Sequence, residues 1–381
     1  MDRSTADDAC PGALQTHRAA DGHLARVRLP GGMITAAQLN AVAVAAGDFG
    51  SSTIELTSRG NLQIRGLRDT VAVARLLSAA GLLPSPAHER VRNIVASPLS
   101  GRGGDGRCDI RELVADLDSA LRSDPELSRL PGRFLFGLDD GRGDISGLGA
   151  DVGVHALDDS TAALLLAGRD SGVRLDLAEA AAGLAAVARR FTEVRGNCWR
   201  IRELDDPTAV LGPLSSTAAS GRTWPPSTRP PIGWIEQSDG RVALGAAVPL
   251  GVLDAESARY LAALDTPMAV TPWRSLLLFD LDEGTADVAL RVLAPRGLIF
   301  DQNSPWLWVS ACTGTPGCER SAADVRADAA AAVGGATGAV GDAAGAVGRR
   351  LHFVGCDRAC GSPAEGDVMV ATAAGYTLRS T

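Results

Sequence analysis

The feature that most constrains this chain is a group of four cysteines within its last 70 residues. Two of them form Cys312-Thr-Gly-Thr-Pro-Gly-Cys318, and the other two form Cys356-Asp-Arg-Ala-Cys360. Each pair directly follows an apolar, strand-like stretch, and backbone amides at such turns stabilise thiolates. We therefore expect the fold to bring the two pairs together around a metal.

Four thiolates in two pairs fit either a structural zinc ion or an iron–sulfur cluster. Zinc pairs usually have gaps of about two to four residues, and a five-residue gap beside a three-residue gap departs from that pattern. Four unrelated buried thiols are a third alternative. The isolated cysteines Cys10, Cys108 and Cys198 are interpreted as thiols that bind no metal.

All 37 basic residues are arginines, and the 45 acidic residues give the chain a net charge of −8. A negative total argues against nonspecific binding to nucleic acid, which needs a basic surface. Because lysine is absent, any cationic contact to a substrate must come from guanidinium groups. These stay charged and bind carboxylates through two parallel hydrogen bonds.

No apolar stretch approaches the roughly 20 residues of a transmembrane helix, and the N-terminal MDRSTADDACPG lacks the apolar run of a secretion signal. We therefore expect a cytoplasmic protein with neither a membrane partner nor a nucleic-acid partner. In a reducing compartment, clustered cysteines are more often metal ligands than disulfides.

Two parts of the chain repeat one order of elements. Residues 21–84 read as strand, helix, strand, strand, helix, with Thr35 as the expected N-cap of the first helix, and residues 232–290 start the same order again. Aligning the two parts pairs Pro30 with Pro249, Gly32 with Gly251, and Thr57 with Thr271. The match predicts an internal duplication, and a repeat of this length indicates paired domains rather than a solenoid.

The segments ACTGTPGC and VGCDRACGSPAEGDVMV resemble the cluster motif of the nitrite/sulfite reductase family. That motif pairs C-x5-C with G-C-x3-C and ends in an acidic and an apolar residue, here Asp367 and Val368. The resemblance implies a [4Fe–4S] cluster, with the last cysteine also bridging to a sirohaem iron. The implied ligands are Cys312, Cys318, Cys356 and Cys360.

The segments RLPGG and LTSRGNLQIRGL resemble the ferredoxin-like half domain, which members of this family carry twice. The resemblance implies an α+β fold: a pseudo-two-fold duplicated nitrite/sulfite reductase fold, with two ferredoxin-like half domains and two mixed α/β lobes. The expected parts are a flexible tail (1–20), a first half domain (21–84), a tetrapyrrole or substrate lobe (85–222), a Pro-rich linker (223–231), a second half domain (232–290) and a [4Fe–4S] cluster lobe (291–381).

Within the two lobes, apolar runs predict strands at RFLFGLDD, ADVGVHAL, GLIF and WLWVSAC. Helical spacing predicts helices over about 110–122, 177–191 and 322–333. The Gly/Ala-rich run GGATGAVGDAAGAVG is expected to be a helix weakened by glycine, or a loop.

In that family, cationic side chains surround the sirohaem face and hold the anionic substrate. By their place in matching motifs, the resemblance implies catalytic contacts from Arg59 in TSRGNLQ, Arg92 in RVRNIVASP and Arg133 in LPGRFLFGL. Leu135 stands where the family carries a second basic residue on that strand. Fixed cations of this kind attract a polyanion and stabilise charge during a redox reaction.

The phrases DGHLARVRLPGG, FLFGLDDGRGDI and IGWIEQSDGRVALGAAVPLG resemble the precorrin-3B synthases, a shorter branch of the family. This implies a monooxygenase-type reaction of aerobic cobalamin biosynthesis: hydroxylation of precorrin-3A with O2, followed by lactone formation. NADH would be an indirect electron source acting through a separate reductase, because no G-x-G-x-x-G follows a strand. Sirohaem and a mononuclear iron both remain open as a second iron site.

Two other functions stay open at this point. One is a short sirohaem-dependent nitrite or sulfite reductase, and the other is an electron carrier that uses the cluster alone. The chain length and the apolar Leu135 favour a corrin precursor over a small inorganic anion. The duplicated halves argue against a bare carrier, which has no need of a cavity between them.

Overall fold

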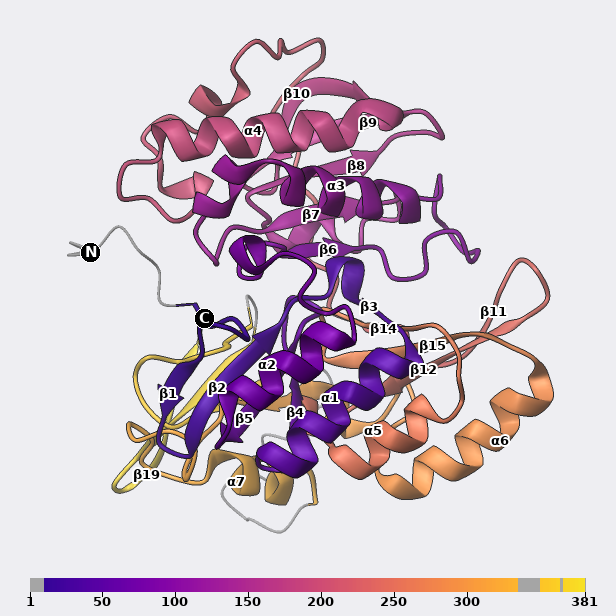
Figure 1. Cartoon of the computed structure of the whole chain (residues 1–381), viewed down its shortest axis with the longest axis vertical. Helices are drawn as coiled ribbons and strands as arrows, with labels where there is room; N and C mark the ends of the chain where they lie inside the picture. The colour runs from indigo at the N-terminus through magenta and orange to yellow at the C-terminus, as the bar shows by residue number, and fades with distance from the viewer. Residues whose placement is uncertain (1–9, 335–349, 364–365, 381) are drawn as a thin grey trace.

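The computed structural model describes residues 10–334, 350–363 and 366–380 (Figure 1). In these ranges the strands form four sheets, one for each half domain and one for each lobe. The Gly/Ala-rich run predicted as a weak helix or loop falls almost entirely outside them. Within the same ranges, no helix combines the length and the apolar character needed to cross a membrane.

The first half domain packs two helices on an antiparallel sheet. The N-cap predicted at Thr35 is confirmed, because its hydroxyl accepts a hydrogen bond from the Gln38 amide and the Gln38 side chain returns one in a capping box. Asp69 caps the second helix in a similar way. The elements of this half are β1 (His17–Ala19), β2 (Gly22–Val27), β3 (Met33–Ile34), α1 (Ala36–Phe49), β4 (Thr53–Leu56), β5 (Leu62–Leu67) and α2 (Thr70–Ala79).

The second half domain repeats this order, so the predicted duplication is confirmed. Asp254 and Asp282 cap its two helices, at the positions that Thr35 and Asp69 hold in the first half. Its elements are β11 (Gly233–Glu236), β12 (Val242–Ala247), β13 (Val252–Asp254), α5 (Ala255–Ala262), β14 (Met268–Val270), β15 (Ser275–Leu281) and α6 (Glu283–Leu293).

Each half domain contributes one short strand to the sheet of the other. The first sheet has the order β1-β2-β5-β4-β13, and the second has the order β11-β12-β15-β14-β3. Strand β13 therefore pairs with β4, and β3 pairs with β14, both antiparallel. Helices α1 and α5 also pack against each other, and buried side chains from both halves form one continuous core (Figure 1). The two halves thus fold as a single unit around a pseudo-two-fold axis.

Glycine permits the close approach at this axis. Gly32 has φ +76°, and a Cβ atom there would collide with the carbonyl oxygen of Val270 in the other half. At the equivalent place in the repeat, a Cβ on Gly251 would lie 3.2 Å from the carbonyl oxygen of Leu56. The sequence alignment that paired Gly32 with Gly251 therefore marks two equivalent points where the backbone of one half passes close to the backbone of the other.

The two lobes also repeat one another. The first lobe has three parallel strands followed by antiparallel ones, and the last lobe has three parallel strands followed by one antiparallel strand. The first contains β6 (Ile94–Ala96), α3 (Arg111–Ser123), β7 (Phe136–Asp139), β8 (Val152–Ala156), β9 (Thr161–Leu166), β10 (Arg169–Asp176) and α4 (Ala180–Val194). The last contains β16 (Val309–Ala311), α7 (Val325–Val333), β17 (Leu351–Val354), β18 (Asp367–Thr372) and β19 (Gly375–Ser380).

Two predicted strands are corrected by the structure. The run WLWVSAC begins as a 3-10 helix over Pro305–Trp308, and only Val309–Ala311 is a strand. The run GLIF makes a single bridge, between Ile299 and Ala247. In both cases most of the apolar side chains are half-buried, and their backbone does not join an extended strand ladder. The segment 1–20 is expected from the sequence to be a flexible tail, but it contains strand β1. Residues 1–9 of this segment fall outside the described residues.

Replacing Gly32 by alanine is expected to destabilise the whole molecule. The new Cβ atom meets a backbone carbonyl that cannot move away cheaply, so we expect a loss of at least about 3 kcal/mol in the free energy of unfolding. Gly81→Ala is the matched control, because Gly81 has a similar φ of +73° and no atom within 4 Å of the place that a Cβ atom would take. That variant should lose only about 1 kcal/mol. Urea denaturation measures both, and equal losses would contradict the proposed packing.

Candidate active site

Two equivalent turns of the duplicated halves face a common cavity. In the first turn, the Thr57 amide donates to the Asn61 carbonyl at 2.9 Å, and in the second the Thr271 amide donates to the Ser275 carbonyl at 2.9 Å. The first turn carries Arg59. The second turn places Arg274 at φ +58°, the position that Gly60 holds at φ +63° in the first. A non-glycine residue in this region is strained, and such strain is commonly retained at functional sites.

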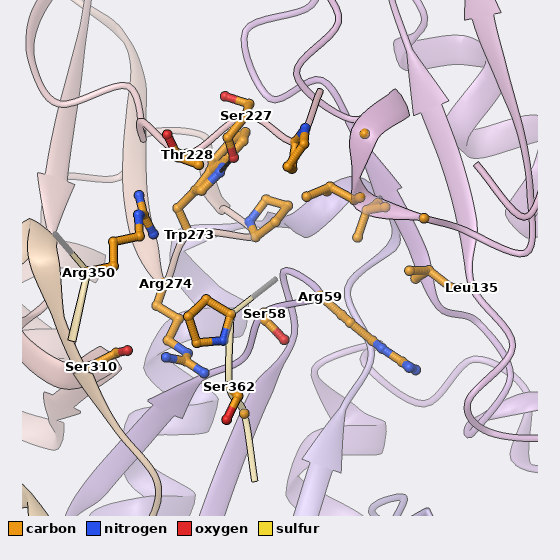
Figure 2. A pocket seen from close by; sticks show the side chains of 18 of the residues that line it. Ser58, Arg59, Leu135, Ser227, Thr228, Trp273, Arg274, Ser310, Arg350 and Ser362 are labelled. Atoms are coloured by element: carbon orange, nitrogen blue, oxygen red, sulfur yellow. Dashed lines mark hydrogen bonds between the residues drawn. The ribbon is translucent and has the colours of Figure 1, made fainter. Parts of the chain in front are cut away.

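The cavity has a volume of about 370 Å³, within the usual range for small-molecule sites. Figure 2 shows Arg59 beside Leu135 on one side of it, and Arg350 and Ser310 on the other. The loop Gly147–Gly149 of the first lobe and the linker residues Pro226–Thr228 also line it. The Pro-rich linker is thus part of the wall. The arginines of the lining are Arg59, Arg200, Arg202, Arg274 and Arg350.

The cationic charge of this lining is only partly neutralised by the protein. Arg200 forms an ion pair with Asp151 at 2.6 Å. Among the described residues, Arg59, Arg202 and Arg274 have no carboxylate partner at ion-pair distance. Burial and the neighbouring Arg200 lower the pKa of Arg59 to about 10, and burial also lowers the pKa of Arg274. Both groups stay charged near neutral pH, so the cavity favours an anionic ligand.

Another part of the wall is apolar. Val95, Leu135 and Leu148 pack together with the ring of Trp273, whose indole N–H donates to the Ser227 carbonyl at 2.8 Å. The Leu135 amide is held by Asp151 at 2.9 Å. The ligand that matches both parts of the wall has an apolar body and several anionic groups.

Three aspartates support the loop that forms the rim of the cavity. The carboxylate oxygens of Asp139, Asp140 and Asp144 lie within 4.8 Å of one another. Burial would raise the pKa of Asp139, but bonds from His155 and from backbone amides hold it below its usual range. Asp140 pairs with Arg142 at 2.7 Å. Because these oxygens already have partners within the protein, the cluster organises the turn that leads to Gly147.

The four cysteines of the C-terminal region line a second cavity of about 260 Å³. Cys312 follows β16 and Cys356 follows β17, as predicted, and the adjacent parallel strands bring the two pairs together. The Gly355 amide donates to the Cys312 sulfur at 3.4 Å. Arg65 of the first half domain also reaches this cavity and forms an ion pair with Asp21 at 3.0 Å.

The four sulfurs do not form a compact group of the kind that a single ion needs. In a zinc site with Zn–S bonds of about 2.3 Å, the sulfurs are about 3.8 Å apart. The structure describes all four cysteines, and no three of their sulfur atoms lie within 4.8 Å of one another. Burial and the three other cysteines raise the pKa of Cys360, so four thiolates here need a compensating cationic centre. Four cysteines around one cavity are the ligand set of a [4Fe–4S] cluster, so the residues present fit such a group.

The two cavities meet at one short segment. Cys360 lines the cysteine cavity, while the next residues, Gly361 and Ser362, line the arginine cavity. The backbone carbonyl of Cys360 accepts a hydrogen bond from His352 Nε2 at 3.0 Å, and His352 Nδ1 lies 2.8 Å from Ser310 Oγ. Burial and the nearby Arg274 lower the pKa of His352 to about 4, so this imidazole is neutral.

The structure brings only some of the predicted arginines to the cavity. Arg59 lines it, and so does Leu135. Arg92 lies instead in a buried ion pair with Asp118 at 2.5 Å. Arg133 stacks on the ring of Trp199 at 4.9 Å. Neither Arg92 nor Arg133 belongs to the described lining of either cavity.

Sequence reasoning missed four cationic lining residues. Arg274 had a usable signal, because the alignment places VTPWRS on the TSRGN turn. Arg202 lies in a short 3-10 helix after α4, Ile201–Glu203, Arg200 directly precedes that helix, and Arg350 precedes β17. No spacing or motif in the chain marks these three. Cys10, Cys108 and Cys198 stay outside the cysteine cavity.

Comparison with known proteins supports this interpretation of the fold. A family model described as the nitrite/sulfite reductase ferredoxin-like half domain matches residues 16–77. The solved structure of the NirA protein of Mycobacterium tuberculosis is similar with a TM-score of 0.77 and 19% identity, over 93% of this chain and 73% of that one. The chain therefore shares its fold with NirA, and residues 16–77 match the half domain of nitrite/sulfite reductases.

One similar protein matches almost the full length of this chain. The chain is 26% identical to a precorrin-3B synthase of Sinorhizobium sp, over 97% of this chain and 82% of that protein. It is 35% identical to a ferredoxin–nitrite reductase of Synechococcus elongatus, but over only 31% of this chain and 25% of the reductase. A sulfite reductase of Mycolicibacterium paratuberculosis is 24% identical over 79% of this chain and 60% of that protein.

Substituting Cys356 or Cys360 by serine should remove most of the bound iron after reconstitution with iron and sulfide. A serine oxygen is a poor ligand for an iron–sulfur cluster, so the brown chromophore should be lost as well. Cys108→Ser is the control, because burial raises the pKa of Cys108 to about 11 and it lies outside the cavity. Iron and sulfide analysis with visible absorption measures the effect. Full iron and sulfide in both ligand variants would refute the assignment.

Proposed function

We propose that this chain is an oxygen- and reductant-dependent oxidoreductase that converts precorrin-3A to precorrin-3B. The observation that carries the proposal is the composition of the cavity beside Cys360. Its arginines without carboxylate partners suit the peripheral carboxylates of a precorrin, and its apolar wall suits the macrocycle. The full-length similarity to a precorrin-3B synthase supports the same substrate.

The proposed reaction hydroxylates C20 of the macrocycle and closes a lactone from the ring A acetate. One atom of O2 enters the product and the other leaves as water, which consumes two electrons and two protons. NADH would supply the electrons through a separate reductase. A [4Fe–4S] cluster held by Cys312, Cys318, Cys356 and Cys360 would pass these electrons singly towards the arginine cavity.

In this account the side chains of the cavity bind and orient the substrate. Arg59, Arg202 and Arg274 would hold carboxylates in fixed positions, and Leu135 and Trp273 would pack against the macrocycle. Leu135 replaces a cation with a methyl-rich surface, which favours a large ligand over a small inorganic anion. The visible absorption of the reconstituted protein distinguishes sirohaem from a mononuclear iron as the second iron site.

A sirohaem-dependent nitrite or sulfite reductase is the second candidate. The similarity to nitrite and sulfite reductases favours it, as do the arginines. An electron carrier that uses the cluster alone is a weaker candidate, because it gives the arginine cavity no role.

The direct test is to incubate the reconstituted protein with precorrin-3A, O2 and a chemical reductant. We expect mass spectrometry to find a product with one added oxygen atom, labelled when ¹⁸O₂ is used. A reaction without O2 is the control. Strong sirohaem absorption with reduction of nitrite or sulfite, and no oxygenated precorrin, would contradict the proposal.

Arg59→Ala should weaken substrate binding in this assay. Loss of one charge-assisted hydrogen bond typically costs about 1.5–3 kcal/mol, which corresponds to a rise in KM of roughly tenfold to a hundredfold. Arg291→Ala is the control, because Arg291 is exposed on α6 and pairs with Asp287. Steady-state kinetics measures both. An unchanged KM and kcat in Arg59→Ala would exclude Arg59 from the substrate site.

A further inference from the structure

A small side pocket lies against the arginine cavity. Trp273, Arg274 and Arg350 line both spaces, and Figure 2 shows them on the side of the arginine cavity opposite Leu135. The side pocket has a volume of about 50 Å³. Apart from the two arginines its lining is apolar, and it includes Ala247, Val248, Leu250, Trp306, Leu307 and Val309.

The duplication shows that two residues of this pocket depart from the pattern of the first half. Leu250 stands at the place that Gly31 holds in the first half, and the two have φ +53° and φ +63°. Arg274 stands at the place of Gly60, as described above. Glycine is the usual residue in this left-handed region, so both side chains are carried at the cost of backbone strain. Both line the side pocket, and strain of this kind is commonly retained where a side chain has a function.

Arg274 gives the side pocket a positive charge that no carboxylate of the protein neutralises directly. Its side chain passes over Gly251, where a Cβ atom would lie 2.8 Å from Arg274 Cδ. Glu55 is the carboxylate with the largest effect on Arg274, but it forms its ion pair with Arg326. Arg350 adds a second guanidinium, and none of the described residues that line the side pocket is acidic. Two guanidinium groups among apolar walls favour a carboxylate ligand.

The size of the side pocket limits the length of the group that can enter. One water-sized group needs about 10–15 Å³, so 50 Å³ holds about three to five such groups. A carboxymethyl group is of this size, and a carboxyethyl group is one methylene longer. Ala247 ends strand β12 and Val309 begins strand β16, so the pocket cannot lengthen without moving a sheet.

We propose that the side pocket binds one carboxymethyl group of the tetrapyrrole in the arginine cavity, and so sets the rotation of the macrocycle there. The inference rests on the proposed function, since it assumes a tetrapyrrole in that cavity. Arg274 and Arg350 hold the carboxylate, and the shallow pocket excludes a carboxyethyl group. Only some positions of a precorrin carry the shorter group, so filling the pocket restricts which edge of the macrocycle faces the segment Cys360–Ser362.

Binding of two zinc porphyrins to the reconstituted full-length protein tests this proposal. Zinc uroporphyrin III carries both carboxymethyl and carboxyethyl groups, whereas zinc octakis(2-carboxyethyl)porphyrin carries the longer group at every position. The two probes have the same number of carboxylates, so their total charge does not distinguish them. Quenching of tryptophan fluorescence measures both Kd values. The wild-type protein should bind zinc uroporphyrin III at least about tenfold more tightly, the effect of one misfitting methylene.

Two variants change the side pocket without touching the described lining of the arginine cavity. Ala247→Leu fills the pocket, so it should weaken zinc uroporphyrin III by about tenfold and change the other probe by less than about twofold. Leu307→Ala deepens the pocket, so it should strengthen the carboxyethyl probe and narrow the preference to less than about threefold. Ala79→Leu, on the exposed surface of α2, is the control and should change neither Kd.

The outcomes separate this inference from the proposed function. If the wild-type protein binds both probes equally, or if Ala247→Leu weakens both equally, the side pocket binds no carboxymethyl group, while the proposed function stands. An unchanged preference in Leu307→Ala would also overturn the inference, and this variant adds no bulk, so it decides the matter if Ala247→Leu fails to fold. Thermal unfolding and iron content report folding of each variant. If the wild-type protein binds neither probe, the tetrapyrrole function fails, and this inference fails with it.

Discussion

The close contact between the two half domains is the constraint on which the rest of the structure depends. Gly32 lies against the carbonyl of Val270, and in the repeat Gly251 lies against the side chain of Arg274 and the carbonyl of Leu56. This contact lets each half donate a strand to the other sheet. It also sets the two equivalent turns next to each other, so that Arg59 and Arg274 face one cavity.

The balance of charge around that cavity separates arginines that pair with a carboxylate of the protein from arginines that remain available to a ligand. Arg92 and Arg102 each bind a carboxylate of the protein, which compensates for their burial. Arg59 and Arg274 are desolvated without such a partner. Burial therefore destabilises their charged forms, which is why the pKa of each guanidinium is lowered. An anionic ligand would remove this cost on binding. The arrangement is therefore more stable with an anion bound than without one, as a binding site requires.

Much of the fold was predictable because its signals are local or repeated. The four cysteines were found from spacing, and the duplication from the order of elements and from paired prolines and glycines. The exchange of strands was not predictable, because β3 has only two residues and no period can be read from it. Arg200, Arg202 and Arg350 also escaped prediction. They lie in or beside short elements without a recognisable sequence pattern, and only the packing of distant parts of the chain brings them to the cavity. Arg92 is the opposite case. Its motif predicted a place in the substrate site, whereas the structure pairs it with Asp118.

The central claim is that a cluster cavity and a tetrapyrrole cavity share the segment Cys360–Ser362. A crystal structure of the reconstituted protein with zinc uroporphyrin III, using anomalous data at the iron and zinc edges, tests it most directly. The account predicts a compact group of iron atoms among the four cysteines. It also predicts the macrocycle, marked by its zinc, in the arginine cavity with carboxylates on Arg59 and Arg202. A single metal ion among the cysteines, or a macrocycle bound elsewhere, would contradict it.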